Sequence, residues 1–430
     1  MIAAPPCYTD DWQRTDPDRV VYLPPRPAGP DGDNEHLIVN YIPRSGELLA
    51  TWTTGAYESA PDTHTVFSHS RDNGRSWTTP QVLPSTADGP MLGGRWGVHL
   101  VSATGRVYFL YNRSTGVWDT SFSINGALTC AYSDDDGHTW VAGGDLAVRR
   151  RERFDHPDPR VHCGWIAWQP AIRDHGGRWL LGFTRWSSLS RFSYPEAGHH
   201  LDARAELMRF DNLDEGPPPQ ELRITWLPEG DSISVPCPVE PERSRGYSLA
   251  EEPAVVTLPD GRLFLVVRTR TGQIWYTVSE DDGASWRPTE VLRRQDHGPE
   301  MVHPKSPCPL YRLADGRYLL FYHNHDGTGY GARGSHDMNA RRPVFLVVGR
   351  YRPGARQPLW FSDPRLLFDT DGVAVGPGNG TVEGGRTWLA LYGSLTEAGG
   401  ERILWYPDRK HFLLGRLLTD EALSGFTVPG

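Results

Sequence analysis

Long apolar stretches are missing from this sequence of 430 residues. No segment approaches the roughly 18 consecutive apolar residues that a membrane-spanning helix needs. The first residues, MIAAPPCYTDDW, also lack the basic and apolar parts of a secretory signal peptide. We therefore expect no membrane partner. As written, the chain is expected to be cytoplasmic, or secreted if its N-terminus has been trimmed.

Cysteine is scarce, and its five residues are odd in number and show no C-x-x-C spacing. They are Cys7, Cys130, Cys163, Cys237 and Cys308. This pattern indicates neither a cysteine-based zinc site nor a complete disulfide framework. We expect buried free thiols instead.

An excess of positive charge is also missing, because 44 Lys and Arg residues face 53 Asp and Glu residues, a net charge of −9. No basic stripe runs along the sequence in the way that a phosphate backbone requires. We therefore expect no nucleic-acid partner. Apolar residues make up 38 % of the chain, which is enough for a sizeable core.

What the sequence does contain is a large number of turn residues, with 46 Gly and 37 Pro. Between them lie short apolar runs such as RLFLVVRTR and RYLLFYHNH. Short alternating runs that are bounded by turn residues are typical of β-strands rather than helices. The composition therefore favours an all-β fold.

One octapeptide pattern, S-x-D-x-G-x-x-W, occurs three times, as SRDNGRSW at 70–77, SDDDGHTW at 133–140 and SEDDGASW at 279–286. The spacing predicts one degenerate copy midway between the last two, around Asp211. In a hairpin turn the Asp accepts hydrogen bonds from the backbone, the Gly takes a positive φ and the Trp packs back as an apolar plug. We interpret the octapeptide as a structural staple and not as a catalytic motif.

A second repeat gives the number of structural units. Gly-centred turns recur about 68 residues apart, and they lie near residues 46, 105, 177, 261, 316 and 385. A unit of this length holds four short strands and cannot bury both faces of its sheet alone. Six such units predict a six-bladed β-propeller that spans 1–430 as one domain, although two separate domains remain an alternative. We expect a strand near Val20 to Leu23 to close the ring, by pairing with the blade whose third strand is HFLLGRL.

The three octapeptides resemble Asp-boxes, and from about Asn34 to Arg416 the chain resembles the sialidase superfamily of six-bladed propellers. The resemblance is closest in EEPAVVTLPDGRLFLVVRTR, followed by YTVSEDDGASW. It implies that Glu252 is the functional Glu and that Arg268 binds a carboxylate. It also implies a substrate Arg at Arg342, in ARRPVFLVV. Asp-boxes occur in hydrolases, lyases and binding domains. The resemblance therefore indicates the fold more strongly than it indicates any one reaction.

Two positions depart from the sialidase pattern. Sialidases begin the first inner strand with Arg-Ile-Pro, whereas this chain has NEHLIVNYIP, with Glu35 and His36 near that position. They also begin the sixth inner strand with the nucleophilic Tyr, whereas this chain has GPGNGTV around Asn379. Tyr392 is predicted nearby, on the second strand. We therefore expect the resemblance to predict the fold of this chain better than it predicts sialic acid as the substrate.

Strand direction predicts where a site lies. The octapeptides and Gly-centred turns share one face of the disc, so the starts of first strands and the ends of second strands meet at the opposite mouth. The candidate catalytic residues there are Glu252, Glu35, Tyr392, His36, His99 and Asp62. The candidate substrate-binding residues are Arg268, Arg95, Arg113, Arg185, Arg342, Trp96, Trp165, His323 and His325.

Each of these residue types also has a structural interpretation. The tryptophans are as suited to packing between blades as to stacking on a sugar, and the histidines to a core position as to catalysis. In the run HNHD, His323 and His325 share one side of a strand, but no third ligand is evident. We therefore expect no metal, and no other cofactor.

Tryptophan faces together with charged hydrogen-bonding groups suit a carbohydrate, and several arginines suit a carboxylate on it. The first hypothesis is a sialidase-like glycoside hydrolase acting on a terminal, acidic sugar. Its acid and base would come from Glu35, Glu252, Glu58 and Asp62, with Tyr392 backed by Glu252 as the nucleophile.

Two alternatives remain open, and the sequence does not indicate the oligomeric state. The first is a lyase that cleaves a uronate-containing glycan by β-elimination, with an Arg on the carboxylate and a His or Tyr as the base. Its candidate bases are His36, His99, His162, His303 and Tyr392. The second is a non-catalytic glycan-binding propeller, which needs no matched acid and base.

Overall fold

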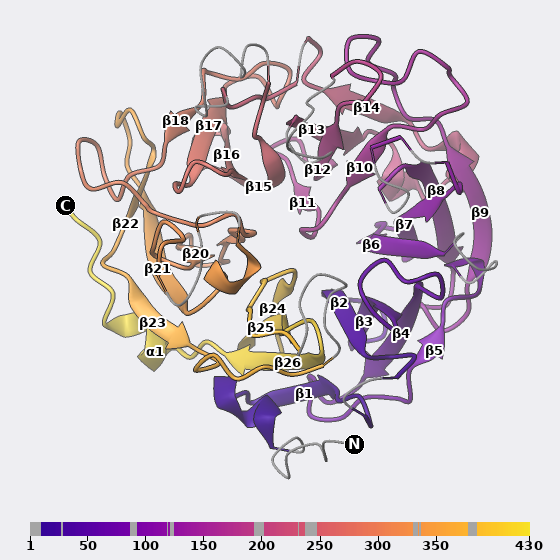
Figure 1. The fold of residues 1–430 in the computed structure, drawn as a ribbon, viewed down its shortest axis with the longest axis horizontal. Coiled ribbons are helices and arrows are strands. Elements are labelled where there is room, and N and C mark those ends of the chain that lie inside the picture. The colour runs from indigo at the N-terminus through magenta and orange to yellow at the C-terminus, as the bar shows by residue number, and fades with distance from the viewer. Residues whose placement is uncertain are drawn as a thin grey trace.

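Six antiparallel sheets are arranged like blades around a central axis in the computed structural model (Figure 1). It describes residues 10–26, 29–86, 93–117, 119–120, 124–192, 202–230, 232–236, 247–329, 334, 337–376 and 385–430. The predicted six-bladed, all-β propeller is confirmed. In this described part of the chain, no helix is long and apolar enough to cross a membrane.

The first three blades follow the chain in order. Blade one contains β2 (Asp33–Ile42), β3 (Glu47–Gly55), β4 (His64–Ser70) and β5 (Gln81–Val82). Blade two contains β6 (Gly94–Val101), β7 (Val107–Ser114), β8 (Gly126–Ser133) and β9 (Val141–Leu146). Blade three contains β10 (Gly164–Ile166), β11 (Ile172–Arg173), β12 (Trp179–Trp186), β13 (Ala203–Phe210) and β14 (Ile224–Leu227).

The other three blades complete the ring. Blade four contains β15 (Glu251–Thr257), β16 (Leu263–Arg268), β17 (Trp275–Ser279) and β18 (Glu290–Val291). Blade five contains β19 (Leu310–Arg312), β20 (Tyr318–Tyr322), β21 (Val344–Tyr351), β22 (Leu359–Phe361) and β23 (Arg365–Phe368). Blade six contains β24 (Ser394–Ala398), β25 (Glu401–Asp408), β26 (Phe412–Leu417) and β1 (Arg19–Tyr22).

Helical structure is limited to short segments. The α-helix α1 (Asp420–Ser424) follows β26. Turns of 3-10 helix span Asp11–Thr15, Pro84–Thr86, Leu213–Glu215, Pro219–Glu221 and Met338–Ala340.

The ring is closed by the two ends of the chain. β1 pairs antiparallel with β26, and Arg19 lies opposite Gly415. The first strand of the chain therefore completes the last blade, as predicted, and Figure 1 shows the indigo strand beside the yellow blade. This pairing covers an edge of β26 that would otherwise expose unpaired backbone groups.

Five of the six predicted Gly turns lie between the first and second strands of their blades, and their glycines have positive φ. The sixth prediction is wrong. The hairpin of blade six turns at Gly399 and Gly400, between β24 and β25, whereas Gly385 precedes the blade, next to an isolated bridge from Val375 to Arg386. Both sites carry Gly-Gly followed by an apolar run, so the local pattern does not distinguish them.

The corrected position of the turn in blade six also changes the strand to which Tyr392 is assigned. The residue lies two positions before β24, the inner strand of blade six, and not on a second strand. Its backbone carbonyl accepts a hydrogen bond from the backbone N–H of Leu37 in β2, at 2.9 Å. Tyr392 therefore stands at the start of the sixth inner strand, where the resemblance to sialidases places a Tyr.

The octapeptides are turn staples, as interpreted from the sequence. Asp135 accepts hydrogen bonds from the backbone N–H of Thr139 at 2.8 Å, from the Thr139 hydroxyl at 2.7 Å and from the Ser133 hydroxyl at 2.7 Å. Asp72 and Asp281 make the same set of bonds in their own turns. Burial works to raise the pKa of Asp135, but the hydrogen bonds from Thr139 outweigh it and lower the pKa to about 2.

Replacing Asp135 with Ala is expected to lower the free energy of unfolding by about 1–3 kcal/mol, because backbone and hydroxyl donors lose their acceptor. Urea denaturation measures this loss. Asp134→Ala is the matched control, since the exposed Asp134 pairs with Arg106 at the surface, where such pairs contribute at most about 1 kcal/mol. Equal losses in the two variants would contradict the staple interpretation.

The core lies between neighbouring blades, where the apolar faces of adjacent sheets meet. Phe264 and Tyr276 of blade four, for example, pack in one cluster with Leu320 and Val347 of blade five. Within the described residues the cysteines are free thiols: Cys130 and Cys308 are buried, and Cys163 is partly buried. Cys7 and Cys237 lie outside the described residues.

Candidate functional site

Three of the inner strands begin with the same distortion. The strand register shifts near the start of β2, β6 and β15, where a β-bulge places two residues opposite one. The residue at each bulge has a left-handed backbone, at His36 (φ 60°), Trp96 (φ 53°) and Glu252 (φ 48°). Such angles are uncommon for residues other than Gly and gather at functional sites. The three bulges mark the predicted mouth.

Glu252, Arg268 and Tyr392 form one hydrogen-bonded cluster, called here the Tyr392 cluster. The Tyr392 hydroxyl donates to Glu252 Oε1 at 3.0 Å, and Arg268 Nη1 donates to Tyr392 Oη at 2.8 Å. Arg268 Nη1 also lies 2.6 Å from Glu252 Oε1. All three side chains are buried. The structure thus brings together the Glu and Arg of blade four, as predicted, with the Tyr of blade six.

The Tyr392 phenol is held in its protonated form. Burial raises the pKa of Tyr392 to about 12, and the nearby Glu252 carboxylate adds to the rise, although Arg268 opposes it. Glu252 is an acceptor in place for the phenolic proton, and the Arg268 cation faces the same oxygen. The cluster is therefore arranged to remove a proton from Tyr392 while a cation stabilises the charge that develops on Oη.

A second carboxylate fixes Arg268 from its other side. Arg268 Nε donates to Glu251 Oε2 at 2.9 Å, and Lys305 Nζ lies 3.3 Å from the same oxygen. Burial lowers the pKa of Lys305 to about 7, against the attraction of Glu251. Arg268 therefore compensates the charge of Glu251 and Glu252 in the protein interior, and Lys305 contributes a second positive charge only when it is protonated.

Lys410 holds two further carboxylates beside the Tyr392 ring. Its Nζ lies 2.5 Å from Glu35 Oε2, 2.8 Å from Glu58 Oε1 and 5.3 Å from the centre of the Tyr392 ring. We call Lys410, Glu35 and Glu58 the Lys410 group. Trp96 Nε1 donates to Glu35 Oε1 at 2.9 Å. Because Lys410 contacts both sets, the two sets form one site.

The two carboxyl groups of the Lys410 group differ in their ionisation. Burial raises the pKa of Glu35 to about 7, although Lys410 works against it. For Glu58 burial acts in the same direction, but the attraction of Lys410 prevails and lowers the pKa to about 2. Near neutral pH, Glu58 is therefore ionised, whereas burial acts against the ionised form of Glu35.

No sequence motif marks Lys305 or Lys410 as a site residue, yet the composition of the sequence singles out both. Of the 44 Lys and Arg residues only these two are lysines. Both are buried, and both pair with carboxylates of the site. Lys410 lies in the turn between β25 and β26, a position that no family motif marks.

Three predicted substrate arginines are instead paired with other carboxylates. Arg113 pairs with Asp145 at 2.7 Å, and Arg342 with Asp369 at 2.6 Å. Arg185 is buried between Asp155 and Glu206, at 2.8 and 2.9 Å. The structure therefore does not bring the guanidinium groups of Arg113, Arg185 and Arg342 to the Tyr392 cluster. Their carboxylate partners are distant in the sequence and were not predictable from it.

Arg341 faces the site in place of its neighbour Arg342. It is buried, its Nε donates to the Lys305 carbonyl at 3.1 Å, and its charge acts on Tyr392, Glu58 and Lys305. The Arg beside the Tyr392 cluster is thus Arg341, one position before the Arg342 that the resemblance implies. Arg341 ends the 3-10 turn Met338–Ala340, and the two neighbours have different partners: Arg341 bonds to the Lys305 carbonyl, and Arg342 pairs with Asp369.

Arg95 and Trp96 lie beside Glu35, as the mouth prediction requires. Burial lowers the pKa of Arg95 to about 10, and the Glu35 carboxylate opposes this shift. The Arg95 guanidinium carbon also lies 5.7 Å from the centre of the Trp96 ring.

The candidate histidines His36 and His99 are neutral. Both are buried, and burial lowers the pKa of each to about 3. The His36 ring lies next to the backbone of Gly97 and Ala167. Neither ring gains a proton near neutral pH, so their contacts do not support a role as general acid.

His323 and His325 have structural partners. The two nitrogens of His323 lie 2.9 Å from the Pro343 carbonyl and 3.0 Å from the Ser306 hydroxyl. His325 lies 2.9 Å from the Arg342 carbonyl and accepts from the Gly327 N–H at 3.1 Å. These bonds occupy both rings, so they do not support the predicted contact with substrate.

Trp165 and Asp62 also lie apart from the Tyr392 cluster. Trp165 Nε1 donates to the Gly126 carbonyl at 3.0 Å, and its ring packs in the core between blades two and three. Asp62 is exposed in the loop between β3 and β4 and accepts a long hydrogen bond, 3.3 Å, from the Ala56 N–H. Asn379 lies outside the described residues.

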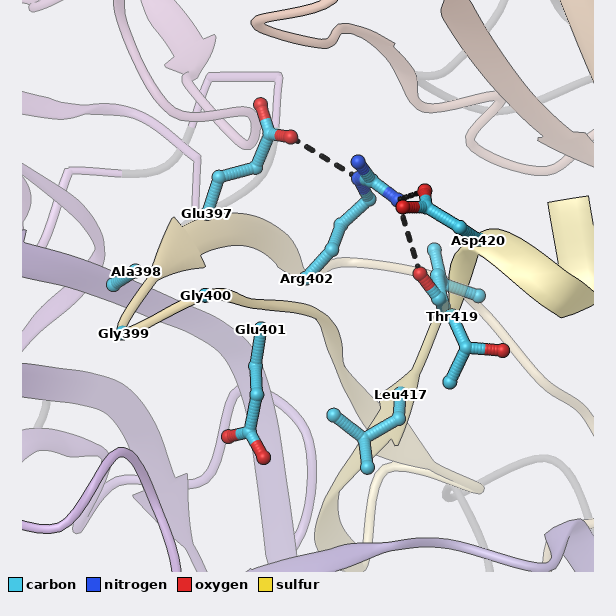
Figure 2. A pocket seen from close by; sticks show the side chains of 10 residues that line it. Glu397, Ala398, Gly399, Gly400, Glu401, Arg402, Leu417, Thr419 and Asp420 are labelled. Atoms are coloured by element: carbon cyan, nitrogen blue, oxygen red, sulfur yellow. Dashed lines mark hydrogen bonds and ion pairs between the residues drawn. The ribbon is translucent and has the colours of Figure 1, made fainter.

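A pocket of about 550 Å³ lies at the other end of β24, beside the turn of Gly399 and Gly400 (Figure 2). Figure 2 shows Arg402 between the carboxylates of Glu397 and Asp420, at 3.1 and 3.3 Å. The arginine of this pocket is therefore already neutralised, and the Tyr392 cluster remains the candidate site.

The sequence model of the BNR repeat-like domain family matches residues 46–371. The chain belongs to this family. The predicted membership of the sialidase superfamily is thereby confirmed. No curated protein sequence matches the chain.

Solved structures similar to this BNR-family propeller share its fold at low identity. A protein of unknown function from Dyadobacter fermentans has a TM-score of 0.58 and 15 % identity over 93 % of this chain and 96 % of its own. The intramolecular trans-sialidase from Ruminococcus gnavus has a TM-score of 0.57 and 13 % identity over 94 % and 99 %. The NanB sialidase from Streptococcus pneumoniae has a TM-score of 0.57 and 12 % identity over 94 % and 70 %.

Proposed function

We propose that this protein is a glycoside hydrolase in which Tyr392 is the nucleophile and Glu252 is its base. The observation that carries the proposal is the buried hydrogen bond from the Tyr392 hydroxyl to Glu252, with Arg268 donating to the same phenolic oxygen. A nucleophile in contact with a base that a third group orients is the arrangement that covalent catalysis requires. The similarity of the fold to sialidases agrees with this chemistry.

The reaction has two displacement steps. In the first, Tyr392 Oη bonds to the anomeric carbon as the bond to the leaving oxygen breaks, and the phenolic proton passes to Glu252. A general acid protonates the leaving oxygen. In the second, water attacks the anomeric carbon and gives its proton to the residue that acted as acid. The bond to Tyr392 Oη breaks as water attacks, and Oη recovers its proton from Glu252.

Glu35 is assigned as the general acid. Its raised pKa, about 7, leaves a proton available near neutral pH, and Lys410 fixes it beside the Tyr392 ring. Glu58 is held ionised by the same lysine and serves to fix the Lys410 position. Asp62, the other candidate in that loop, is exposed.

The substrate is proposed to be a terminal, acidic sugar. Arg341 is buried at the site, and within the described residues its guanidinium bonds to the Lys305 carbonyl and forms no ion pair with a carboxylate. A substrate carboxylate would therefore accept hydrogen bonds from Arg341 without displacing a protein acid. Lys305, with its pKa lowered to about 7, would become fully charged beside such an anion.

The assignment of Glu35 predicts an alkaline limb in the pH profile. A general acid acts only when protonated, so kcat/KM is expected to fall about tenfold per pH unit above a pKa near 7. Initial rates between pH 5 and 9 measure the limb. Glu35→Gln is expected to remove it, together with most of the activity towards leaving groups that need protonation. An unchanged limb in Glu35→Gln would assign the acid to another group.

A panel of chromogenic acidic glycosides and uronate-containing polysaccharides separates hydrolysis from the alternatives. We expect release of the terminal sugar without new near-ultraviolet absorbance, because hydrolysis creates no double bond. An unsaturated, absorbing product would indicate elimination. Saturable binding without any product would indicate a glycan-binding propeller. Glu252 on the Tyr392 hydroxyl and Glu35 on the neighbouring Lys410 favour hydrolysis, since elimination needs no such pair of carboxyl groups.

A further inference from the structure

Three potential metal ligands converge on the face of the propeller that carries the turns. They are Glu47 at the start of β3, His69 in β4 and His138 in the octapeptide turn of blade two. We call them the Glu47 triad. Glu47 lies six residues along β3 from Thr53, which pairs with Glu35, so roughly 20 Å of strand separates the triad from the Tyr392 site.

The spacing of the triad fits a tetrahedral ion. Glu47 Oε2 lies 3.2 Å from His69 Nδ1 and 3.3 Å from His138 Nε2, and all three atoms lie within 4.8 Å of one another. Zinc forms bonds of about 2.0–2.1 Å to such atoms, which places two ligands on one ion roughly 3.4 Å apart. The two separations from Glu47 match this value.

The hydrogen bonds around the triad leave its inner atoms as acceptors. His69 Nε2 lies 3.1 Å from the Gly137 carbonyl, which only accepts, so that nitrogen carries a proton. In the neutral ring Nδ1 then presents a lone pair to Glu47 Oε2, another acceptor. Neither atom has a hydrogen-bond partner among the described residues. A cation between the two would satisfy both.

The surroundings orient these ligands. The Gly137 carbonyl fixes the tautomer of His69, and Arg71 Nε donates to Glu47 Oε1 at 2.6 Å, which leaves Oε2 directed at the histidines. The rings of His69 and His138 stack at 4.2 Å with 17° between their planes, so the exposed His138 ring must tilt for both nitrogens to bind one ion. A backbone carbonyl on the second nitrogen and a partner on the second carboxylate oxygen are the usual supports of metal ligands.

We propose that Glu47, His69 and His138 bind one divalent transition-metal ion, zinc by the chemistry of the ligands, which ties blade one to blade two. Two imidazoles and one carboxylate are a common ligand set for zinc, with water in the fourth position. Glu47 and His69 belong to blade one and His138 to blade two, so the ion crosses an interblade boundary. Arg44 of blade one already bonds to Asp136 in the same turn, at 2.9 Å.

Titration of chelator-treated protein with zinc chloride, followed by calorimetry, tests the proposal. We expect one equivalent to bind and the melting temperature to rise with zinc, since the ion binds the folded state. His138→Asn, at an exposed position, is expected to weaken binding at least tenfold and to abolish the thermal shift. His175→Asn, an exposed histidine of another turn on this face, is the matched control and is expected to change neither.

His69→Gln is a second test, and His138→Asn keeps the test decisive if that buried variant fails to fold. Cobalt replaces zinc in a separate titration, where visible absorption bands of four-coordinate cobalt are expected and are lost in His138→Asn. Saturable binding that His138→Asn leaves unchanged, or the absence of one-equivalent binding, would overturn the proposal. In that case the triad is an ion pair of Glu47 with protonated histidine.

Discussion

Replacing Tyr392 with Phe is expected to reduce kcat/KM by about 10³-fold or more, because the variant lacks the atom that attacks the sugar. The fold should survive, since the Glu252–Arg268 ion pair at 2.6 Å does not depend on the hydroxyl. Steady-state rates on the best glycoside of the panel give the loss, and circular dichroism and urea denaturation verify the fold.

Tyr311→Phe is the matched control for this prediction. Tyr311 is also buried, and its hydroxyl donates to the Gly393 carbonyl at 3.1 Å, close in sequence to Tyr392. Its loss should lower stability slightly and leave kcat/KM within about twofold, since it contacts no reacting group. If Tyr392→Phe retained the activity of this control, Tyr392 would not be the nucleophile.

Replacing Arg268 with Met is expected to lower the free energy of unfolding by about 3–5 kcal/mol, because two buried carboxylates lose their shared cation. Glu251 and Glu252 lie 2.9 and 2.6 Å from the guanidinium and are both buried. Lys305 remains beside Glu251, whereas among the residues that the structure describes the Glu252 carboxylate keeps only the Tyr392 hydroxyl. Adding Glu252→Gln to this variant should restore part of the loss, since it removes one uncompensated charge.

Arg356→Met controls for the loss of an arginine as such. Arg356 pairs with Glu290 at 2.9 Å on the exposed surface, where solvent screens the pair and its loss changes stability little. Urea denaturation of the three variants gives the comparison. A loss in Arg268→Met no larger than in Arg356→Met would show that the buried ion cluster is not required for stability.

The architecture was predictable because it repeats. The octapeptides and five of the Gly turns are local features whose chemistry determines their conformation, and their spacing gives the number of blades. The turn of blade six was wrongly predicted at Gly385 because its Gly-Gly segment resembles the one at Gly399 and Gly400. Only the pairing of β24 with β25, and of β25 with β26, distinguishes the two segments. That error placed Tyr392 on the wrong strand.

The site was only partly predictable. Glu252 and Arg268 follow from the antiparallel pairing of β15 with β16, in which Glu251 lies opposite Arg268. Lys410 joins Glu35 across 375 residues, and Arg185 joins Asp155 across 30, and no pattern within a blade predicts either pair. The choice between Arg341 and Arg342 depended on which of two neighbouring side chains meets Lys305 and which meets Asp369, and no sequence pattern predicts either partner.

The most direct measurement is mass spectrometry of the protein trapped with an activated glycoside that bears fluorine next to the anomeric carbon. The fluorine slows the second displacement, so a covalent glycosyl-protein should accumulate if the reaction passes through one. Peptide mapping is predicted to place one sugar on Tyr392 in the wild-type protein and none in Tyr392→Phe. A sugar on Glu252 or Glu35, or turnover of the unfluorinated glycoside without any trapped species, would contradict the assignment of Tyr392 as the nucleophile.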